Sequence, residues 1–269
     1  MRRFLILGHK APVDSSFSLS DLPGGAGRLD VLCRAVGASL FLSHGIRLDV
    51  ETVLLIRNEI QIRFAGDQVR RINPDERSTA AIIRHALDAI GQEEIESTPG
   101  VYVSRRSLSD ALDRLYQLEA APILLHEDGA PAESYAFPEN PAFILSDHLE
   151  FTDEELEIMD DLPRVSVGPT SLHTSQVITI IHFLLDRFEQ DLNSDLVLCH
   201  VVWGEPKAQL IKGLLEDFSI PCNLVGHVPA SVYPVVLNGL ASVRIMVRPR
   251  DLERARAIIG DYFEEPVEE

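Results

Sequence analysis

The chain has 269 residues, 45% of them hydrophobic, and a formal net charge of −18 at pH 7. This length and apolar content allow one large core or two smaller ones, and no apolar run approaches the roughly 20 residues of a membrane-spanning helix. The opening stretch, MRRFLILGHKAPVD, is too short in apolar residues for a secretory signal, and three cysteines do not make a disulfide framework. These features argue against a membrane protein and a disulfide-rich secreted protein, and we expect a cytoplasmic protein.

Strand-like and helix-like stretches alternate along residues 1–190, which is typical of an α/β layer architecture. Short apolar runs bounded by turn residues predict the strands, and apolar residues at helical spacing predict the helices. The predicted strands cover residues 4–7, 51–56, 101–103, 122–125, 142–145 and 164–167, with a hairpin-like pair within 60–69. The predicted helices cover residues 28–36, 78–90, 107–118 and 175–188.

After a predicted linker, DLNSD at 191–195, the pattern restarts and indicates a second, smaller domain at 194–265. Its elements follow the order β-α-β-β-α, which favours a ferredoxin-like sandwich. The strands are predicted at 196–203, 221–228 and 243–249, and the helices at 206–218 and 250–263. The final EEPVEE is expected to fray.

Three predicted strands of the first domain each end in a polar turn. The turns read HEDGAP, SDHLEFTDEE and GPTSLHTS. Ligands of open α/β sheets bind outside the carboxyl ends of the strands, so we expect these turns to line one crevice. Neither GxGxxG nor GxxxxGK[ST] is present, which argues against an ordinary dinucleotide-binding fold and a P-loop.

The order of these stretches gives a family resemblance over residues 1–190. The stretches are GHKAPVDSSFSLSDLPGGAGRLDVLCR, LSHGIRLDV, NPDERSTAA, ESTPGVYVSRR, LLHEDG, FILSDHLEFTDEE and SVGPTSLHTSQ. Together they resemble the archaeal-type tRNA (pseudouridine-N1)-methyltransferase family, a branch of the SPOUT methyltransferases. The second domain resembles a small bacterial domain that has been proposed to act in signalling.

The resemblance implies an α/β SPOUT-type sheet whose last part, about residues 120–190, forms a trefoil knot that binds S-adenosylmethionine (SAM). It also implies recognition of the adenosyl group by backbone atoms and apolar side chains, with Gly168 allowing close approach. By position, the implied cofactor-binding residues are Leu125, His126, Ser146, Asp147, Val167, Gly168, Pro169 and Leu172. Some relatives carry a cysteine in the run after the last turn; Ser175 stands in that neighbourhood here and is included in the set.

The implied reaction moves a methyl group to N1 of a pseudouridine, most simply in a tRNA T-loop. The N1–H must lose its proton, and a nearby carboxylate would help. Asp14, Asp30 and Asp147 are the candidate bases, although Asp30 in GRLD is equally well interpreted as an ion-pair partner of Arg28. Histidines 9, 44 and 148 also lie in matching motifs, where a capping role is the simpler interpretation.

The charge is unevenly distributed, which bears on the RNA partner. Counted along the sequence, residues 1–114 carry 15 Lys/Arg and 15 Asp/Glu, whereas residues 115–163 carry 13 Asp/Glu and no Lys or Arg. Arginine grips phosphate and stacks on bases, so within the family context we predict RNA contacts. The candidates are Arg28, Arg34, Arg77, Arg105 and Arg106. The acidic segment 127–161 would face away from RNA or surround the sulfonium.

The resemblance also implies a homodimer through the knot, with the apolar helix at 177–185 as the interface. Two alternatives stay open: the same fold acting on another RNA acceptor, or a non-catalytic SAM-binding regulator whose second domain contacts a protein partner. Cys199, His200, Cys222 and His227 lack zinc-ligand spacing, and no metal is predicted.

Overall fold

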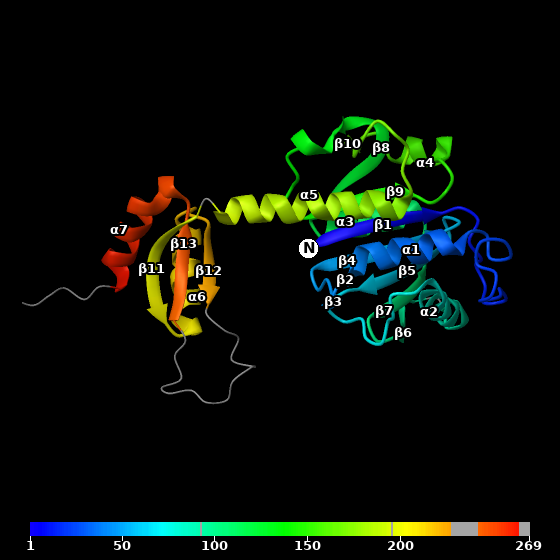
Figure 1. Cartoon of the computed structure of the whole chain (residues 1–269), viewed down its shortest axis with the longest axis horizontal. Helices are drawn as coiled ribbons and strands as arrows, with labels where there is room; N and C mark the ends of the chain where they lie inside the picture. The colour runs from blue at the N-terminus through cyan, green and yellow to red at the C-terminus, as the bar shows by residue number, and fades with distance from the viewer. Residues whose placement is uncertain (92, 195, 227–241, 264–269) are drawn as a thin grey trace, which may run out of the picture. The chain divides into compact units, whose positions relative to one another are not determined.

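A computed structural model describes residues 1–91, 93–194, 196–226 and 242–263. The chain divides into two units, Met1–Leu185 and Asp186–Glu269, each with its own core (Figure 1).

The first unit is built on an eight-stranded sheet in the order β10-β8-β9-β1-β4-β5-β7-β6. The five strands from β10 to β4 are parallel, and β5, β7 and β6 continue the sheet in antiparallel fashion. Every residue of β1 and β4 is buried, as expected for central strands covered on both faces. The strands are β1 (Arg2–Gly8), β4 (Val50–Ile56), β5 (Ile60–Ala65), β6 (Ile95–Thr98), β7 (Val101–Arg105), β8 (Ala121–Pro131), β9 (Pro141–Ser146) and β10 (Arg164–Ser166). A small hairpin, β2 (Phe41–Leu42) and β3 (Gly45–Ile46), stands apart.

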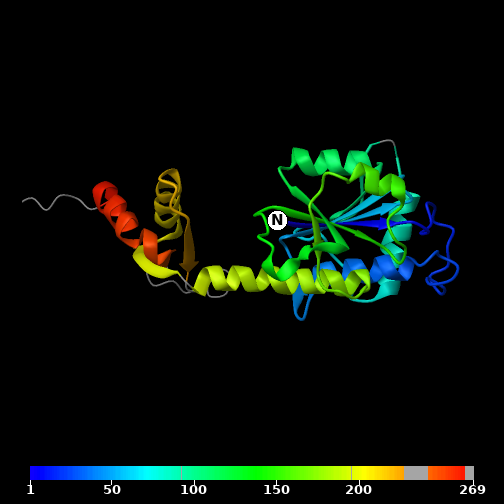
Figure 2. The same ribbon diagram turned by 90° about the horizontal axis from the view of Figure 1, so that it is seen from above.

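Helices cover both faces of this sheet (Figure 2). One face packs against α1 (Leu29–Leu40), α2 (Glu76–Asp88) and α5 (Thr174–Ser194), and the other against α3 (Leu108–Gln117) and α4 (Asp153–Ile158). Capping boxes begin α3 and α4, in which Ser107 and Thr152 bond reciprocally with the residue three positions on. A 3₁₀ turn, η1 (Ala132–Ser134), follows β8. Among the described residues, no helix is long and apolar enough to cross a membrane.

A buried histidine fixes α5 to the sheet. His182 Nε2 donates to the Ser39 carbonyl on α1 at 3.0 Å, and its Nδ1 accepts from Arg2 on β1 at 3.2 Å. The ring also packs edge-on against Phe4 at 5.0 Å. Because each ring nitrogen has a partner, the polar group is buried without an unmet hydrogen bond.

Most predicted elements of the first unit are confirmed, with several corrections. The predicted hairpin within 60–69 is wrong: β5 ends at Ala65, pairs with β4 and β7, and is followed by a turn in which the Val69 amide donates to the Ala65 carbonyl. Strands β2, β3 and β6 and helix α4 were not predicted. The predicted linker at 191–195 is helical as far as Ser194, because α5 continues through it.

A further correction concerns the turn HEDGAP, since β8 continues through it to Pro131. Leu124 of β8 pairs with Arg164 of β10, and the next residue of β10, Val165, pairs with Ala130. Residues 125–129 of β8 therefore have no partner in β10 and bulge out of the ladder. Turn-forming residues are well suited to such a bulge, which re-aims side chains at the end of a strand.

The second unit is a small α+β layer. Its antiparallel sheet has the order β11-β13-β12, and α6 and α7 cover one face. The elements are β11 (Val197–Trp203), α6 (Glu205–Asp217), β12 (Cys222–Gly226), β13 (Ser242–Val247), the 3₁₀ turn η2 (Pro249–Asp251) and α7 (Leu252–Phe263). The predicted strand at 221–228 is confirmed as far as Gly226. The rest of it, which includes His227, lies outside the described residues, as does the final EEPVEE.

Gly129 allows β10 to lie against the bulged part of β8. A Cβ at Gly129 would stand 2.4 Å from the Val165 amide nitrogen and 2.5 Å from its carbonyl carbon, and backbone cannot yield as a side chain can. We expect Gly129→Ala to lower the free energy of unfolding of the first unit by about 1–3 kcal/mol.

The measurement is denaturant unfolding, monitored by circular dichroism. Gly37→Ala on α1 is the matched control, since its Cβ would meet only Phe41 at 3.9 Å, and it should stabilise by about 0.5–1 kcal/mol. The only tryptophan, Trp203, reports separately on the second unit. Equal stability of the two variants would contradict the close approach.

Candidate cofactor-binding site

A cavity of about 650 Å³ lies beyond the carboxyl ends of β8, β9 and β10. The three predicted turns all contribute to it, so the expected single crevice is present. Its lining residues are Arg28, Leu125, His126, Glu127, Leu145, Ser146, Asp147, His148, Leu149, Glu150, Phe151, Val165, Ser166, Val167, Gly168, Thr170, Ser171, Leu172, His173, Thr174, Gln176 and Val177.

The bulge of β8 supplies one wall. It places Leu125, His126 and Glu127 at the cavity. A hydrogen bond with Ser171 lowers the pKa of Glu127 below the usual value of glutamate and links this wall to the loop after β10. This wall therefore presents a carboxylate beside an apolar residue.

The loop after β10 presents backbone and apolar groups. Ser166 Oγ donates to the Gly168 carbonyl at 2.9 Å and accepts from its amide at 3.3 Å, which fixes the turn. A Cβ at Gly168 would meet no described protein atom within 4 Å, so the space in front of this peptide is open. Val167 and Leu172 line the cavity beside it.

These features fit SAM, which the resemblance implies. Cavities of roughly 300–1,000 Å³ hold ligands of this size. An adenine ring can pack against Leu125, Val167 and Leu172 and approach the open peptide at Gly168, while Glu127 and Glu150 suit the cationic sulfonium and amino groups.

Asp147 organises the polar end of the cavity. Its side chain is 2% exposed. Its Oδ1 accepts from the Leu149 amide at 2.9 Å and from His9 Nδ1 at 3.0 Å, and its Oδ2 accepts from the His9 amide at 2.9 Å. Burial alone would raise the pKa of Asp147, but the hydrogen bonds from His9 and the Leu149 amide outweigh it, and the pKa lies below the usual value.

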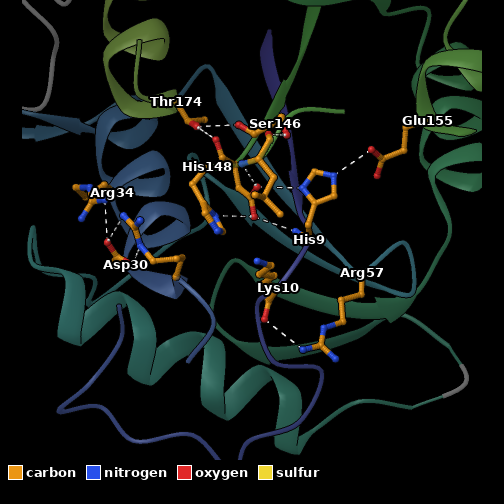
Figure 3. Close-up of polar contacts among 12 residues, drawn as sticks. His9, Lys10, Asp30, Arg34, Arg57, Ser146, His148, Glu155 and Thr174 are labelled. Atoms are coloured by element: carbon orange, nitrogen blue, oxygen red, sulfur yellow. Dashed lines mark hydrogen bonds and ion pairs between the residues drawn. The ribbon is translucent and has the colours of Figure 1, made fainter. Parts of the chain in front are cut away.

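His9, directly after β1, is clamped between two carboxylates (Figure 3). Its Nε2 lies 3.0 Å from Glu155 Oε2, opposite the bond to Asp147. The hydrogen bond to Asp147 and that to Glu155, against burial, raise the pKa of His9 to about 9. At neutral pH His9 is therefore an imidazolium that joins the ends of β1 and β9 to the start of α4.

Thr174 ties the start of α5 to the same loop. Its Oγ1 donates to the carbonyls of Ser146 at 2.8 Å and Asp147 at 3.1 Å, and Ser146 Oγ donates to the Leu149 carbonyl (Figure 3). The loop after β9 is thus bonded to the start of α5 as well as to His9.

Not every predicted residue lies at the cavity. Among the described residues, Pro169 and Ser175 flank its lining without being part of it. Asp14 is exposed, and the Ser16 hydroxyl and amide donate to it and lower its pKa. Asp30 is buried; burial would raise its pKa, but ion pairs with Arg28 at 3.0 Å and Arg34 at 2.9 Å outweigh this and lower it.

The predicted arginines gather at the carboxyl edge of the strands. Arg28 lines the cavity, Arg34 and Arg77 lie on the helices that begin there, and Arg105 ends β7, which runs parallel to β4. Arg77, Arg105 and Arg106 are exposed, with Arg105 paired to Glu59.

Sequence reasoning missed the clamp of His9 and Glu155. Two signals were available. His9 immediately follows a buried strand, and in α/β sheets the residues that contact ligands follow the carboxyl ends of strands. Glu155 is the acidic member of the T-x-x-E capping box.

The raised pKa of His9 predicts that the free energy of unfolding falls at alkaline pH. The stabilisation is fully present below the usual histidine value of 6.5 and is lost as pH rises through about 9. Between pH 6 and 10, the wild-type protein should lose about 2–3 kcal/mol of unfolding free energy that His9→Gln does not lose. The measurement is denaturant unfolding across this range, with the exposed His85→Gln as control; identical slopes for all three proteins would rule out the clamp.

Comparison with known proteins identifies relatives of both parts of the chain. Residues 1–190 match the family model described as "Putative SAM-dependent RNA methyltransferase", and residues 205–262 match one described as "Putative prokaryotic signal transducing protein". The tRNA (pseudouridine(54)-N(1))-methyltransferases of Haloferax volcanii and Haloarcula marismortui are 49% and 48% identical over 192 residues, 69% of this chain and 96% of each relative.

A solved structure shares the fold. Archaeoglobus fulgidus Nep1 bound to S-adenosylhomocysteine aligns with a TM-score of 0.51 and 13% identity, covering 70% of this chain and 99% of that chain. The family model covers most of the chain, and the relatives align over nearly their whole length. The chain therefore belongs to the family of SAM-dependent RNA methyltransferases.

Proposed function

We propose that the protein transfers a methyl group from SAM to N1 of a pseudouridine in tRNA. The observation that carries this proposal is the 49% identity to a tRNA pseudouridine-N1 methyltransferase across 96% of that relative. The strand-end cavity supports it, because its residues come from the segments that the family resemblance singled out.

In this proposal the cavity holds the cofactor by its backbone and apolar walls. Leu125, Val167, Gly168 and Leu172 surround the adenine, and Ser146 and Asp147 shape the floor. When bound, SAM supplies an electrophilic methyl group on a cationic sulfur. The protein positions the two reactants, which in well-oriented systems lowers the barrier by about 7–11 kcal/mol.

The carboxyl edge of the strands is the proposed RNA surface. Besides the five predicted arginines, Lys10 and Arg57 lie at this edge: Lys10 follows His9, and Arg57 Nη2 donates to the Lys10 carbonyl at 3.2 Å. Both side chains are exposed. A target base must leave the tRNA loop to reach the cavity, and phosphate contacts around the cavity would hold the splayed loop.

The trefoil knot and a homodimer are part of the same proposal. Because β10 lies beside β8 on the side away from β9, the chain must cross over β8 on its way from β9 to β10. Helix α5 then starts back at the cavity, where Thr174 bonds to Ser146, and a crossing of this kind is compatible with a knot. The partly exposed Val177 and Ile180 on α5 offer an apolar surface for a second copy. The proposed catalytic domain spans residues 1–190. An enzyme that acts on tRNA is expected in the cytoplasm.

For residues 194–265 we propose a ferredoxin-like domain that contacts a protein partner. Its strand order, β11-β13-β12, is that of a split β-α-β unit. Its match to a signal-transducing family supports a role outside the methyl transfer.

The reaction is tested with labelled SAM and T-loop tRNA transcripts that carry either pseudouridine or uridine at the target position. We expect 1-methylpseudouridine, identified by nucleoside mass spectrometry, only from the pseudouridine transcript, because uridine has no N1–H. Methylation of both transcripts would point to another acceptor. Calorimetric binding of SAM without methylation of any tRNA would favour the regulatory alternative.

The RNA surface is tested with Arg105→Ala/Arg106→Ala. We expect tRNA affinity to fall roughly tenfold, and the slope of log affinity against log salt to fall by about 0.7–0.9 per lost phosphate contact. Affinity for SAM should not change. Arg164→Ala, at the amino end of β10, is the matched control and should leave tRNA binding unchanged. An equal loss in both proteins would contradict the proposed surface.

A further inference from the structure

The proposed methyl transfer needs a proton acceptor, and this inference rests on that function. N1 of pseudouridine carries a hydrogen that must leave as the nitrogen attacks carbon. A positioned general base commonly supplies 10²–10⁴-fold in rate, and imidazole is the side chain most often used. The base must lie at the cavity and must have a free lone pair.

The three carboxylates considered from the sequence are engaged elsewhere. The Ser16 hydroxyl and amide donate to Asp14, which lies outside the described lining of the cavity. Two arginines neutralise Asp30. Asp147 accepts three hydrogen bonds, and its lowered pKa makes it a weak base.

We propose that His148 is the general base and that Asp147 positions it. His148 lines the cavity, and its side chain is 19% exposed. Its Nδ1 is buried and lies 3.4 Å from Asp147 Oδ2, within ion-pair distance but without the alignment of a hydrogen bond to any described group (Figure 3). Contacts of this kind between catalytic groups often tighten into hydrogen bonds only when the substrate is bound.

The carboxylate beside Nδ1 decides which nitrogen can accept a proton. A negative oxygen at this distance favours the tautomer with hydrogen on Nδ1, which leaves the lone pair on Nε2. His9 does not compete for the role, because both of its nitrogens already face carboxylates.

The step balances as follows. The N1 lone pair forms the bond to the methyl carbon, the carbon–sulfur bond breaks with its electrons passing to sulfur, and the N1 proton moves to Nε2 of His148. The products are 1-methylpseudouridine, S-adenosylhomocysteine and an imidazolium that returns its proton to water.

Several charged or titratable groups lie around the cavity near His148. They are Asp147 and Glu150 on the same loop, Arg28 before α1, His9 after β1, and His173 before α5.

The first test needs no activity. Nitrogen-15 NMR of the nine histidine side chains in the full-length protein, with His148 assigned by its absence in His148→Asn, should show a neutral Nδ1–H tautomer for His148 at pH 8. An Nε2–H tautomer would overturn the proposal, because the lone pair would then face Asp147.

The second test is single-turnover methyl transfer by His148→Asn. The asparagine amide can keep a donor near Asp147 but offers no basic nitrogen. We expect a 10²–10⁴-fold lower rate at pH 7.5, and a residual rate that keeps rising with pH where the wild type levels off. Affinities for SAM and tRNA should stay within about threefold. His85→Asn on the exposed side of α2 is the control.

The outcomes separate the two proposals. A His148→Asn rate within threefold of wild type overturns the role of His148 and leaves the methyl transfer standing. An unsubstituted protein that methylates no pseudouridine overturns both. Should His148→Asn fail to fold by circular dichroism, His148→Gln and the NMR tautomer decide in its place.

Discussion

The cavity depends on one buried ion pair between the ends of two neighbouring parallel strands. Asp147, directly after β9, accepts hydrogen bonds from the ring and from the backbone amide of His9, directly after β1. Glu155 binds the other nitrogen of the same ring. A buried carboxylate is costly unless it is paired and fully hydrogen-bonded, so these contacts stabilise the SDH loop in the arrangement seen. That arrangement places Ser146, His148 and Leu149 around the cavity and gives Thr174 two carbonyls to bind.

The remaining walls are made of backbone. The register shift in β8 and the lack of a side chain at Gly129 let β10 close against the bulge, and the open peptide at Gly168 faces the cavity. A site of this kind recognises its ligand through peptide groups and a few apolar side chains. In the proposed function, the charged side chains at the carboxyl edge contact a different partner, the phosphates of the RNA. The proposed cofactor and RNA surfaces are therefore adjacent and made from the same strand ends.

The sequence predicted what depends on short-range patterning and missed what depends on pairing across the sheet. The run FLIL in β1 and the capped helix α3 follow from local signals. The hairpin predicted within 60–69 was misplaced by one strand, because β5 forms its hairpin with the preceding β4 and pairs on its other edge with the more distant β7. Asp147 and His148 were noticed as turn residues, but the sequence separation of 138 between His9 and Asp147 hid the clamp. That the Asp147 carboxylate already accepts three hydrogen bonds could be recognised only from the structure, which shows where its donors lie.

A crystal structure of the full-length protein with S-adenosylhomocysteine tests the central claim most directly, namely that the strand-end cavity is the cofactor site. The account predicts the adenine ring against Leu125, Val167 and Leu172, with backbone contacts at Gly168, and the sulfur directed toward the end of the cavity that holds His148. A ligand bound outside these walls, or a bound complex in which the His9–Asp147 contact is broken, would contradict it.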